Sequence, residues 1–140
     1  MDDNTAAVSS TIPVELVCAG IGERITFDAT WWYDAQDPFA VHVDFLLPLG
    51  LTERWSFGRD LLAEGLEVPT GRGDVLIEPD EDHRHVLLQL RGAHGSALLR
   101  TEEASLYAFL DRSYAQVPAG AEQCEADLDR WLSGLPDGSQ

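Results

Sequence analysis

The 140-residue chain contains no lysine, and all nine of its basic residues are arginines. These arginines are spread singly along the sequence and face 25 aspartates and glutamates, so the formal net charge is -16. A protein that is held to phosphates by counterion release needs clustered Lys and Arg side chains. The sequence therefore argues against nucleic acid and anionic membranes as partners. Such an acidic surplus is typical of a protein whose net charge keeps it soluble.

Cysteine is also scarce, since Cys18 and Cys124 are the only two. Nothing in residues 1–10 resembles a signal peptide, because a basic start and a long apolar run are both missing. We therefore expect a cytoplasmic protein. In a reducing compartment, two isolated cysteines are more often buried apolar side chains than a disulfide, which is the alternative. No apolar run reaches the roughly 20 residues that span a bilayer, so direct membrane insertion is not expected.

No catalytic motif is assembled in the sequence. Gly71-Arg72-Gly73 begins like a dinucleotide-binding loop, but Leu76 stands where the third glycine belongs and the segment enters a strand. A phosphate-binding loop and a Gly-x-Ser-x-Gly elbow are both absent. We therefore expect no enzymatic activity, no catalytic residue and no cofactor.

The histidines offer the only opening for metal chemistry. His83 and His85 would share one face of a strand, and four acidic residues lie close by in residues 78–82. This loop supports the alternative of a small metal-dependent enzyme, but a tetrahedral site needs four suitable ligands and an acidic loop tip is usually solvated. We therefore expect no metal. His42 and Asp44 share the polar face of another strand, where we expect an ion pair rather than acid and base catalysis.

The chain length fits one domain, which we place at residues 11–137 after a disordered tail at residues 1–10. Alternating apolar residues predict about seven strands. They are expected near residues 12–18, 25–33, 39–47, 51–57, 75–77, 86–90 and 97–100. A short helix over residues 61–64, capped by Asp60 and ended by Gly65, separates the two halves of the sheet. Residues 69–73 are interpreted as a turn.

Two helices are predicted at the C-terminal end. The first begins at Thr101, whose hydroxyl can accept free amide protons, and reaches about Gln116. The second carries a single apolar stripe at helical spacing. The stripe is formed by Cys124, Leu128, Trp131, Leu132 and Leu135. The element order predicts an α+β fold of antiparallel sheets, because no parallel crossover unit is visible.

Candidate contact residues lie on the strands and on the last helix. Trp32 faces away from Trp31 and Tyr33, so it falls on the polar side of its strand. It is either half-covered by a loop or an anchor for a partner, since Trp is enriched among residues that dominate binding energy. The candidates for partner or subunit contacts are Trp32, His42, Leu128, Trp131 and Leu132.

Four segments of the chain resemble the SsgA-like sporulation and cell-division proteins of actinomycetes, and most closely their SsgB branch. They are Tyr33-Asp34, residues 37–41 (DPFAV), residues 59–66 (RDLLAEGL) and residues 69–75 (PTGRGDV). Such a run of matched segments is far more specific than a lone glycine motif. Phe39 stands where Tyr is familiar and Gly58 where Ala is, and the loop over residues 80–85 is peculiar to this chain.

The resemblance implies a non-enzymatic adaptor for septum formation in sporulating hyphae. It also implies that the protein helps to position the tubulin-like GTPase FtsZ with an SsgA-like partner, in the cytoplasm at the division septum. The implied fold is Whirly-like and the implied assembly is a homo-oligomer, a trimer. A Whirly-like fold raises the alternative of single-stranded nucleic-acid binding, with residues 31–33 as stacking platforms. That alternative needs a positive groove, of which the sequence shows no sign.

Overall fold

The computed structural model describes residues 7–17, 24–93 and 95–134, with the side chains of residues 7 and 124–129 excepted. Within these residues, eight strands form one antiparallel sheet. The strands are β1 (Ala7–Val17), β2 (Arg24–Asp34), β3 (Ala40–Leu46), β4 (Thr52–Gly58), β5 (Thr70–Arg72), β6 (Val75–Pro79), β7 (His85–Gly92) and β8 (Gly95–Glu102). The helices are α1 (Arg59–Gly65), α2 (Glu103–Gln116) and α3 (Glu122–Gly134), with a short turn η2 (Pro48–Gly50) before β4.

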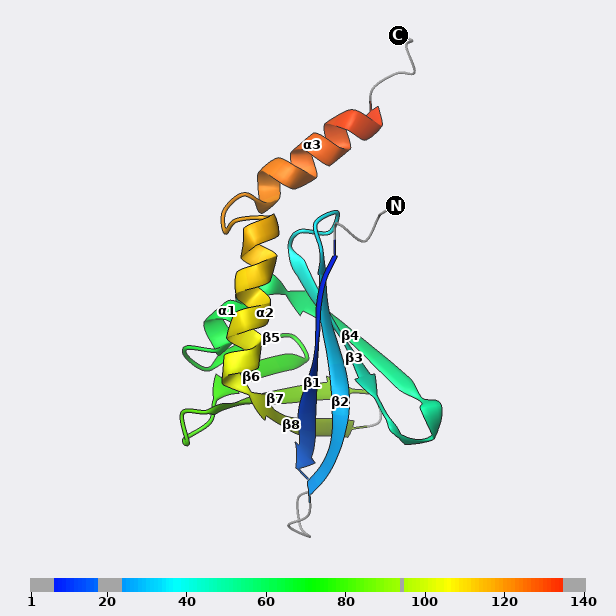
Figure 1. Ribbon diagram of the computed structural model, residues 1–140, viewed down its shortest axis with the longest axis vertical. Coiled ribbons are helices and arrows are strands. Elements are labelled where there is room, and N and C mark those ends of the chain that lie inside the picture. The colour runs from blue at the N-terminus through cyan, green and yellow to red at the C-terminus, as the bar shows by residue number, and fades with distance from the viewer. Residues whose placement is uncertain (1–6, 18–23, 94, 135–140) are drawn as a thin grey trace.

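The sheet has the strand order β4-β3-β2-β1-β8-β7-β6-β5. Its two halves meet where β1 pairs with β8, over residues 14–16 and 99–101. Figure 1 shows the sheet curling, with α2 packed along it and α3 leaving the body beyond the end of α2. This antiparallel sheet with flanking helices confirms the expected α+β class.

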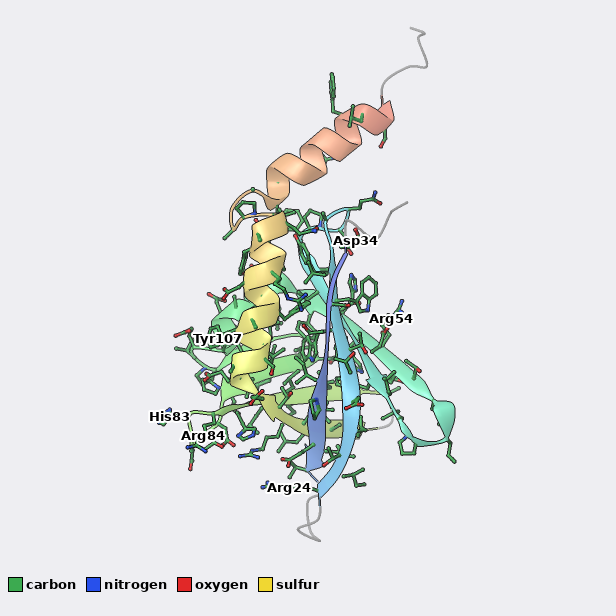
Figure 2. The ribbon with its side chains drawn as sticks, in the orientation of Figure 1. Arg24, Asp34, Arg54, His83, Arg84 and Tyr107 are labelled. Carbon is green, nitrogen blue, oxygen red and sulfur yellow. The ribbon has the colours of Figure 1, made fainter. Side chains whose placement is uncertain are left out.

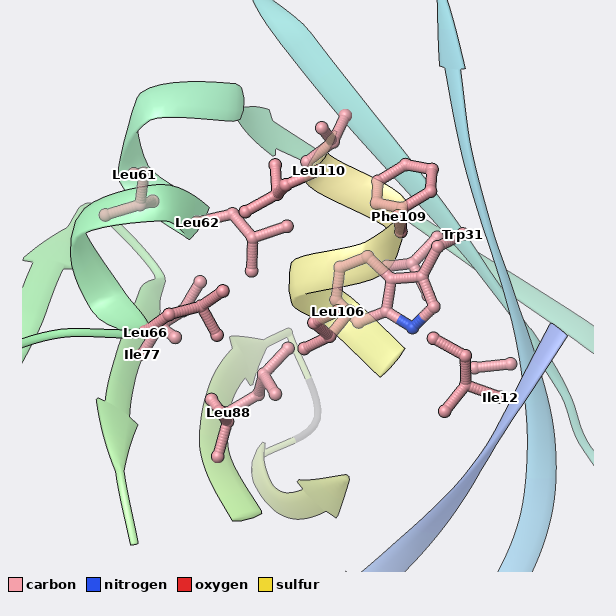
Figure 3. Close-up of a cluster of buried hydrophobic side chains, with 14 of the residues drawn as sticks. Ile12, Trp31, Leu61, Leu62, Leu66, Ile77, Leu88, Leu106, Phe109 and Leu110 are labelled. Carbon is pink, nitrogen blue, oxygen red and sulfur yellow. The ribbon is translucent and has the colours of Figure 1, made fainter. Parts of the chain in front are cut away.

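The core lies inside the curl, where the alternating residues of the strands meet α1 and α2. In β2 the predicted alternation is confirmed, because Ala29, Trp31 and Tyr33 are all at most 1% exposed. Trp31 packs against Phe109 of α2, with the ring centroids 6.4 Å apart. Figure 3 shows this cluster. Its labelled members are Ile12, Trp31, Leu61, Leu62, Leu66, Ile77, Leu88, Leu106, Phe109 and Leu110.

Helix α1 packs tightly on the sheet through its last residue. A Cβ atom on Gly65 would lie 2.5 Å from the Cβ of Ile77, closer than real Cβ atoms come, so only glycine fits there. Leu61 and Leu62 are buried on the same side. The helix begins at Arg59, and the predicted cap is wrong, because Gly58 holds the capping position and no side chain bonds there.

Several predicted boundaries differ from the structure. Residues 7–10, expected in the tail, belong to β1, where residue 8 is buried. Residues 70–72, interpreted as a turn, form β5, so the described sheet has eight strands rather than about seven. Thr101 does not start a helix, because it lies in β8 and its hydroxyl donates to the Pro13 carbonyl at 3.0 Å. Phe39 and Leu51, expected to begin strands, lie just before β3 and β4 and are 50% and 61% exposed.

Candidate functional site

Trp32 lies on the outer face of β2, away from the core, as the alternation predicts. Register places His42 of β3 and then Ser56 of β4 directly beside it. The Trp32 and His42 rings stack with their centroids 4.2 Å apart. The Arg54 guanidinium lies 5.0 Å from the Trp32 ring. Trp32 is half-buried, and the side chains of His42 and Arg54 lie against its ring. We call Trp32, His42, Asp44, Arg54 and Ser56 the Trp32 face.

Hydrogen bonds hold the Trp32 face in one arrangement. Arg54 donates from Nε and Nη2 to the two carboxylate oxygens of Asp44, at 2.6 and 3.1 Å. These bonds from Arg54 hold the pKa of Asp44 below its usual value, and a hydrogen bond from Trp32 lowers the pKa further. The predicted pairing of His42 with Asp44 is thus wrong. His42 instead places Nδ1 2.6 Å from Ser56 Oγ and Nε2 3.3 Å from Asp37.

The arrangement suits binding better than chemistry. A two-pronged Arg54 to Asp44 contact and a stacked imidazole fix the indole ring before any partner arrives, which reduces the entropy lost on binding. Figure 2 shows Arg54 on the side of the strands away from α2. The Trp32 face therefore offers a flat aromatic centre with hydrogen-bonding groups around it, as the centre of a protein interface does.

Helix α3 carries the other predicted contact residues. Trp131 and Leu132 are 61% and 52% exposed, so the apolar stripe leaves a large surface uncovered in the single chain. Leu128 and Cys124 lie on the same helix, but their side chains fall outside the described residues, as do Cys18 and His94 altogether. Trp131 and Leu132 lie on α3, which Figure 1 shows leaving the body, whereas Trp32 and His42 lie on β2 and β3. The structure therefore does not bring the two pairs together.

A buried arginine, which sequence reasoning missed, ties the start of α3 to the body. Arg59 is 1% exposed and its guanidinium lies between the rings of Tyr33 and Tyr114, at 4.6 and 4.2 Å. It donates to Glu122 Oε2 at 2.7 Å and to the Ser113 carbonyl at 3.1 Å. Burial acts to raise the pKa of Glu122, but hydrogen bonds, first that from Arg59, outweigh it and lower the pKa.

The acidic loop after β6 is organised around Arg100. Arg100 donates to Asp80 at 2.8 Å, to Asp82 at 2.7 Å and to Glu15 at 3.1 Å. Asp80, Asp82 and His85 do present potential ligand atoms within 4.8 Å of one another. The positive guanidinium already bonds to the two aspartates, so the cluster is a salt-bridge network in this structure.

His83 is separated from that acidic cluster. It has a left-handed backbone conformation, with a φ of 59°, and Figure 2 shows it at the end of the loop, away from the body. The expectation that His83 and His85 share one strand face is therefore wrong, because His83 precedes β7 and only His85 lies in the strand. The backbone N–H of Arg84 is the largest influence that holds the pKa of Asp82 below its usual value, and His85 adds to it.

An apolar cavity of about 370 Å³ opens between the two halves of the curled sheet. Apolar side chains from six strands and two loops line it, with Glu53 as the charged member. The larger lining side chains are Leu16, Phe27, Phe45, Leu47, Trp55, Leu90 and Leu99.

No helix within the described part of the chain is long and apolar enough to cross a membrane.

Comparison with known proteins gives one consistent result. Residues 27–122 match a family model described as "Streptomyces sporulation and cell division protein, SsgA". The sporulation-specific cell division protein SsgB of Streptomyces coelicolor is 46% identical over 105 residues, covering 74% of this chain and 77% of that protein. SsgB of Frankia casuarinae is 34% identical over 131 residues, covering 92% of this chain and 91% of that protein.

Two solved structures share the fold. One, described as an SsgA-like sporulation-specific cell division protein from Thermobifida fusca, has a TM-score of 0.85 at 30% identity and covers 95% of this chain and 98% of its own. The other, described as "Mutations in SsgB correlate to longitudinal cell division during sporulation of Streptomyces coelicolor", has a TM-score of 0.82 at 37% identity. It covers 89% of this chain and 99% of its own.

Proposed function

Because this chain belongs to the SsgA family of sporulation and cell-division proteins, we propose that it acts as a non-enzymatic adaptor in sporulation-specific cell division. Its relatives are named sporulation-specific cell division proteins, which supports a role in that process. In this proposal the protein works at the division septum in the cytoplasm, where it helps to position FtsZ together with an SsgA-like partner. The likeness to Whirly proteins stays a prediction.

The Trp32 face is the observation that carries the adaptor role. A tryptophan on the outer face of a sheet contributes nothing to the core, yet the side chains of His42, Arg54 and Asp44 all contact this one. Ordered aromatic rings surrounded by hydrogen-bonding groups are typical centres of binding energy. We therefore assign Trp32 and His42 to partner contact.

Helix α3 supports the second part of the proposal, a homo-oligomer that we expect to be a trimer. Its exposed Trp131 and Leu132 would be covered by a neighbouring subunit. Exposed apolar side chains grouped on one helix are a common sign of an interface. The two surfaces then divide the work, since α3 assembles the protein and the Trp32 face meets the partner.

The adaptor role is tested by replacing Trp32 with Ala. We expect the change to weaken binding to purified FtsZ by about 30-fold, which corresponds to about 2 kcal/mol for a central contact residue. Ile25→Ala is the matched control, because Ile25 is a 45% exposed apolar residue on the same strand. In sporulating hyphae, a fluorescent fusion of the wild-type protein should lie at FtsZ rings and the Trp32→Ala fusion should not.

Circular dichroism and sedimentation mass separate a contact residue from a structural one. Both should be unchanged in Trp32→Ala, because the residue lies outside the core. If the folded variant binds FtsZ as well as the Ile25→Ala control does, the Trp32 face is not the contact surface. If the wild-type fusion does not meet FtsZ rings, the adaptor role itself is wrong.

A further inference from the structure

Strand β4 is an edge of the sheet, since β3 is its one neighbour among the described strands. Two hydrogen bonds show which of its residues face β3. Arg59 donates its backbone N–H to the Phe39 carbonyl at 2.7 Å, and Leu47 donates to the Leu51 carbonyl at 2.8 Å. Antiparallel ladders alternate, so odd-numbered residues of β4 bond to β3 and even-numbered residues turn their N–H and C=O groups outward. The outward residues are Thr52, Arg54 and Ser56.

The cavity of about 370 Å³ lies beside this edge and receives Glu53 and Trp55 from β4. Trp55 also lines a second cavity of about 340 Å³, together with Leu61 of α1 and with Arg72, Asp74 and Val75. The free edge and the apolar space are separate features of the structure, and they border the same strand. A strand added to β4 would form hydrogen bonds with the outward main-chain groups of β4. Apolar side chains on the inner face of the added strand would have room in the cavity.

Glu53 sets the charge that such a strand must carry. It is exposed and forms no ion pair with any described residue, although it lies among apolar side chains. Because it bonds to β3, it would meet an added strand at a position without hydrogen bonds, where side chains on neighbouring strands come closest. An inward charge of this kind deters unrelated strands from pairing with an edge. A basic residue placed opposite would remove that obstacle.

We propose that β4 binds an extended segment of a partner protein as an added strand. The segment places an apolar side chain in the cavity and, two residues away, a Lys or Arg beside Glu53. A second copy of this chain fits the site less well, because its 25 acidic residues far outnumber its nine arginines. The inference does not depend on FtsZ being the partner, and it uses the main-chain groups of the β4 edge rather than the side chains of the Trp32 face.

The test uses a fluorescein-labelled peptide with the sequence Thr-Val-Ser-Val-Thr-Lys-Thr, its reversed sequence, and versions with Glu in place of Lys. The reversed peptide covers both strand directions. Binding is followed by fluorescence anisotropy on the full chain. We expect one lysine peptide to bind saturably and its Glu version to bind about threefold more weakly, as expected for one cross-strand charge pair. Glu53→Lys should reverse that preference.

Paired variants isolate the main-chain contact. Ser56→Pro and Ser56→Ala both lose the Ser56 bond to His42, but only proline removes the outward N–H. We expect Ser56→Pro to bind the peptide at least about fivefold more weakly than Ser56→Ala, the loss of one main-chain bond. Thr52→Pro against Thr52→Ala repeats the comparison if Ser56→Pro does not fold.

Three results would overturn the inference. One is the absence of saturable binding of every peptide up to about 1 mM, the weak end of specific recognition. Another is equal binding by the folded proline and alanine variants. The third is protection of the Thr52, Arg54 and Ser56 amides from hydrogen exchange that grows with protein concentration and needs no peptide, which would assign the edge to a second copy.

Discussion

Replacing Glu122 with Ala should cost about 3 kcal/mol of unfolding free energy, an unusual amount for a glutamate near the surface. The variant leaves the Arg59 guanidinium without its carboxylate at a site where the arginine is 1% exposed. Removing one partner of a buried ion pair typically costs about 3–5 kcal/mol. The lower end applies here because Glu122 is 15% exposed and the Tyr33 and Tyr114 rings still flank the cation.

Urea unfolding followed by tryptophan fluorescence measures the effect, at one fixed protein concentration because assembly also adds stability. Asp111→Ala is the matched control, since Asp111 is exposed on α2 and should change stability by less than about 0.5 kcal/mol. A loss below about 1 kcal/mol in Glu122→Ala would refute the reasoning. It would mean that water reaches Arg59 when the carboxylate is removed.

A second comparison separates the ion pair from simple packing. Arg59→Met removes the charge and also the Arg59 Nε atom, which has no hydrogen-bond partner in the described structure. If the charge pair matters, Arg59→Met combined with Glu122→Gln should be less destabilising than the sum of the two single changes. We expect a difference of at least about 1 kcal/mol, which is usual for residues in direct contact. Strict additivity would contradict the assigned pairing.

Three further outcomes are expected. The pKa of Glu122 lies below its usual value of 4.5, so its contribution to stability is full above pH 4.5 and is lost as pH falls. In Glu122→Gln the unfolding free energy should therefore fall less steeply with decreasing pH. An unchanged dependence on pH would contradict this. Single-stranded DNA should not bind at physiological salt, where charge repulsion still acts over a Debye length of about 8 Å, and micromolar binding by anisotropy would disprove this. Sedimentation should give three times 15.4 kDa, whereas a monomer mass at micromolar concentration would exclude the trimer.

The sheet could be predicted from the sequence because each strand carries a two-residue period. Trp31 and Trp32 are neighbours in the chain, and the alternation alone separated the buried one from the outward one. Strand β5 was missed because it has three residues and includes glycine, so no period can be seen in it. Thr101 was misassigned because its hydroxyl bonds to Pro13 on another strand, a contact between residues far apart in sequence.

The contact surfaces were only partly predictable for a related reason. Trp32, His42, Trp131 and Leu132 could be placed on faces by periodicity, but the partners of His42 depend on strand register, which the sequence does not display. Arg59 was missed entirely. A charged residue at a helix start is usually solvated, and the burial of Arg59 follows from the two aromatic rings that β2 and α2 bring to it.

One of the segments that carry the family resemblance, residues 59–66, is explained by packing rather than by partner contact. Arg59 and Leu61 are buried, and Gly65 leaves no room for a side chain against Ile77. These residues fix α1 on the sheet and the start of α3 on the body. A match to this segment therefore indicates a shared fold. What distinguishes one partner from another must lie on exposed groups outside it: the Trp32 face, the edge of β4 beside Glu53, and the uncovered side of α3. Substitutions there should alter partner choice while unfolding free energy stays nearly unchanged.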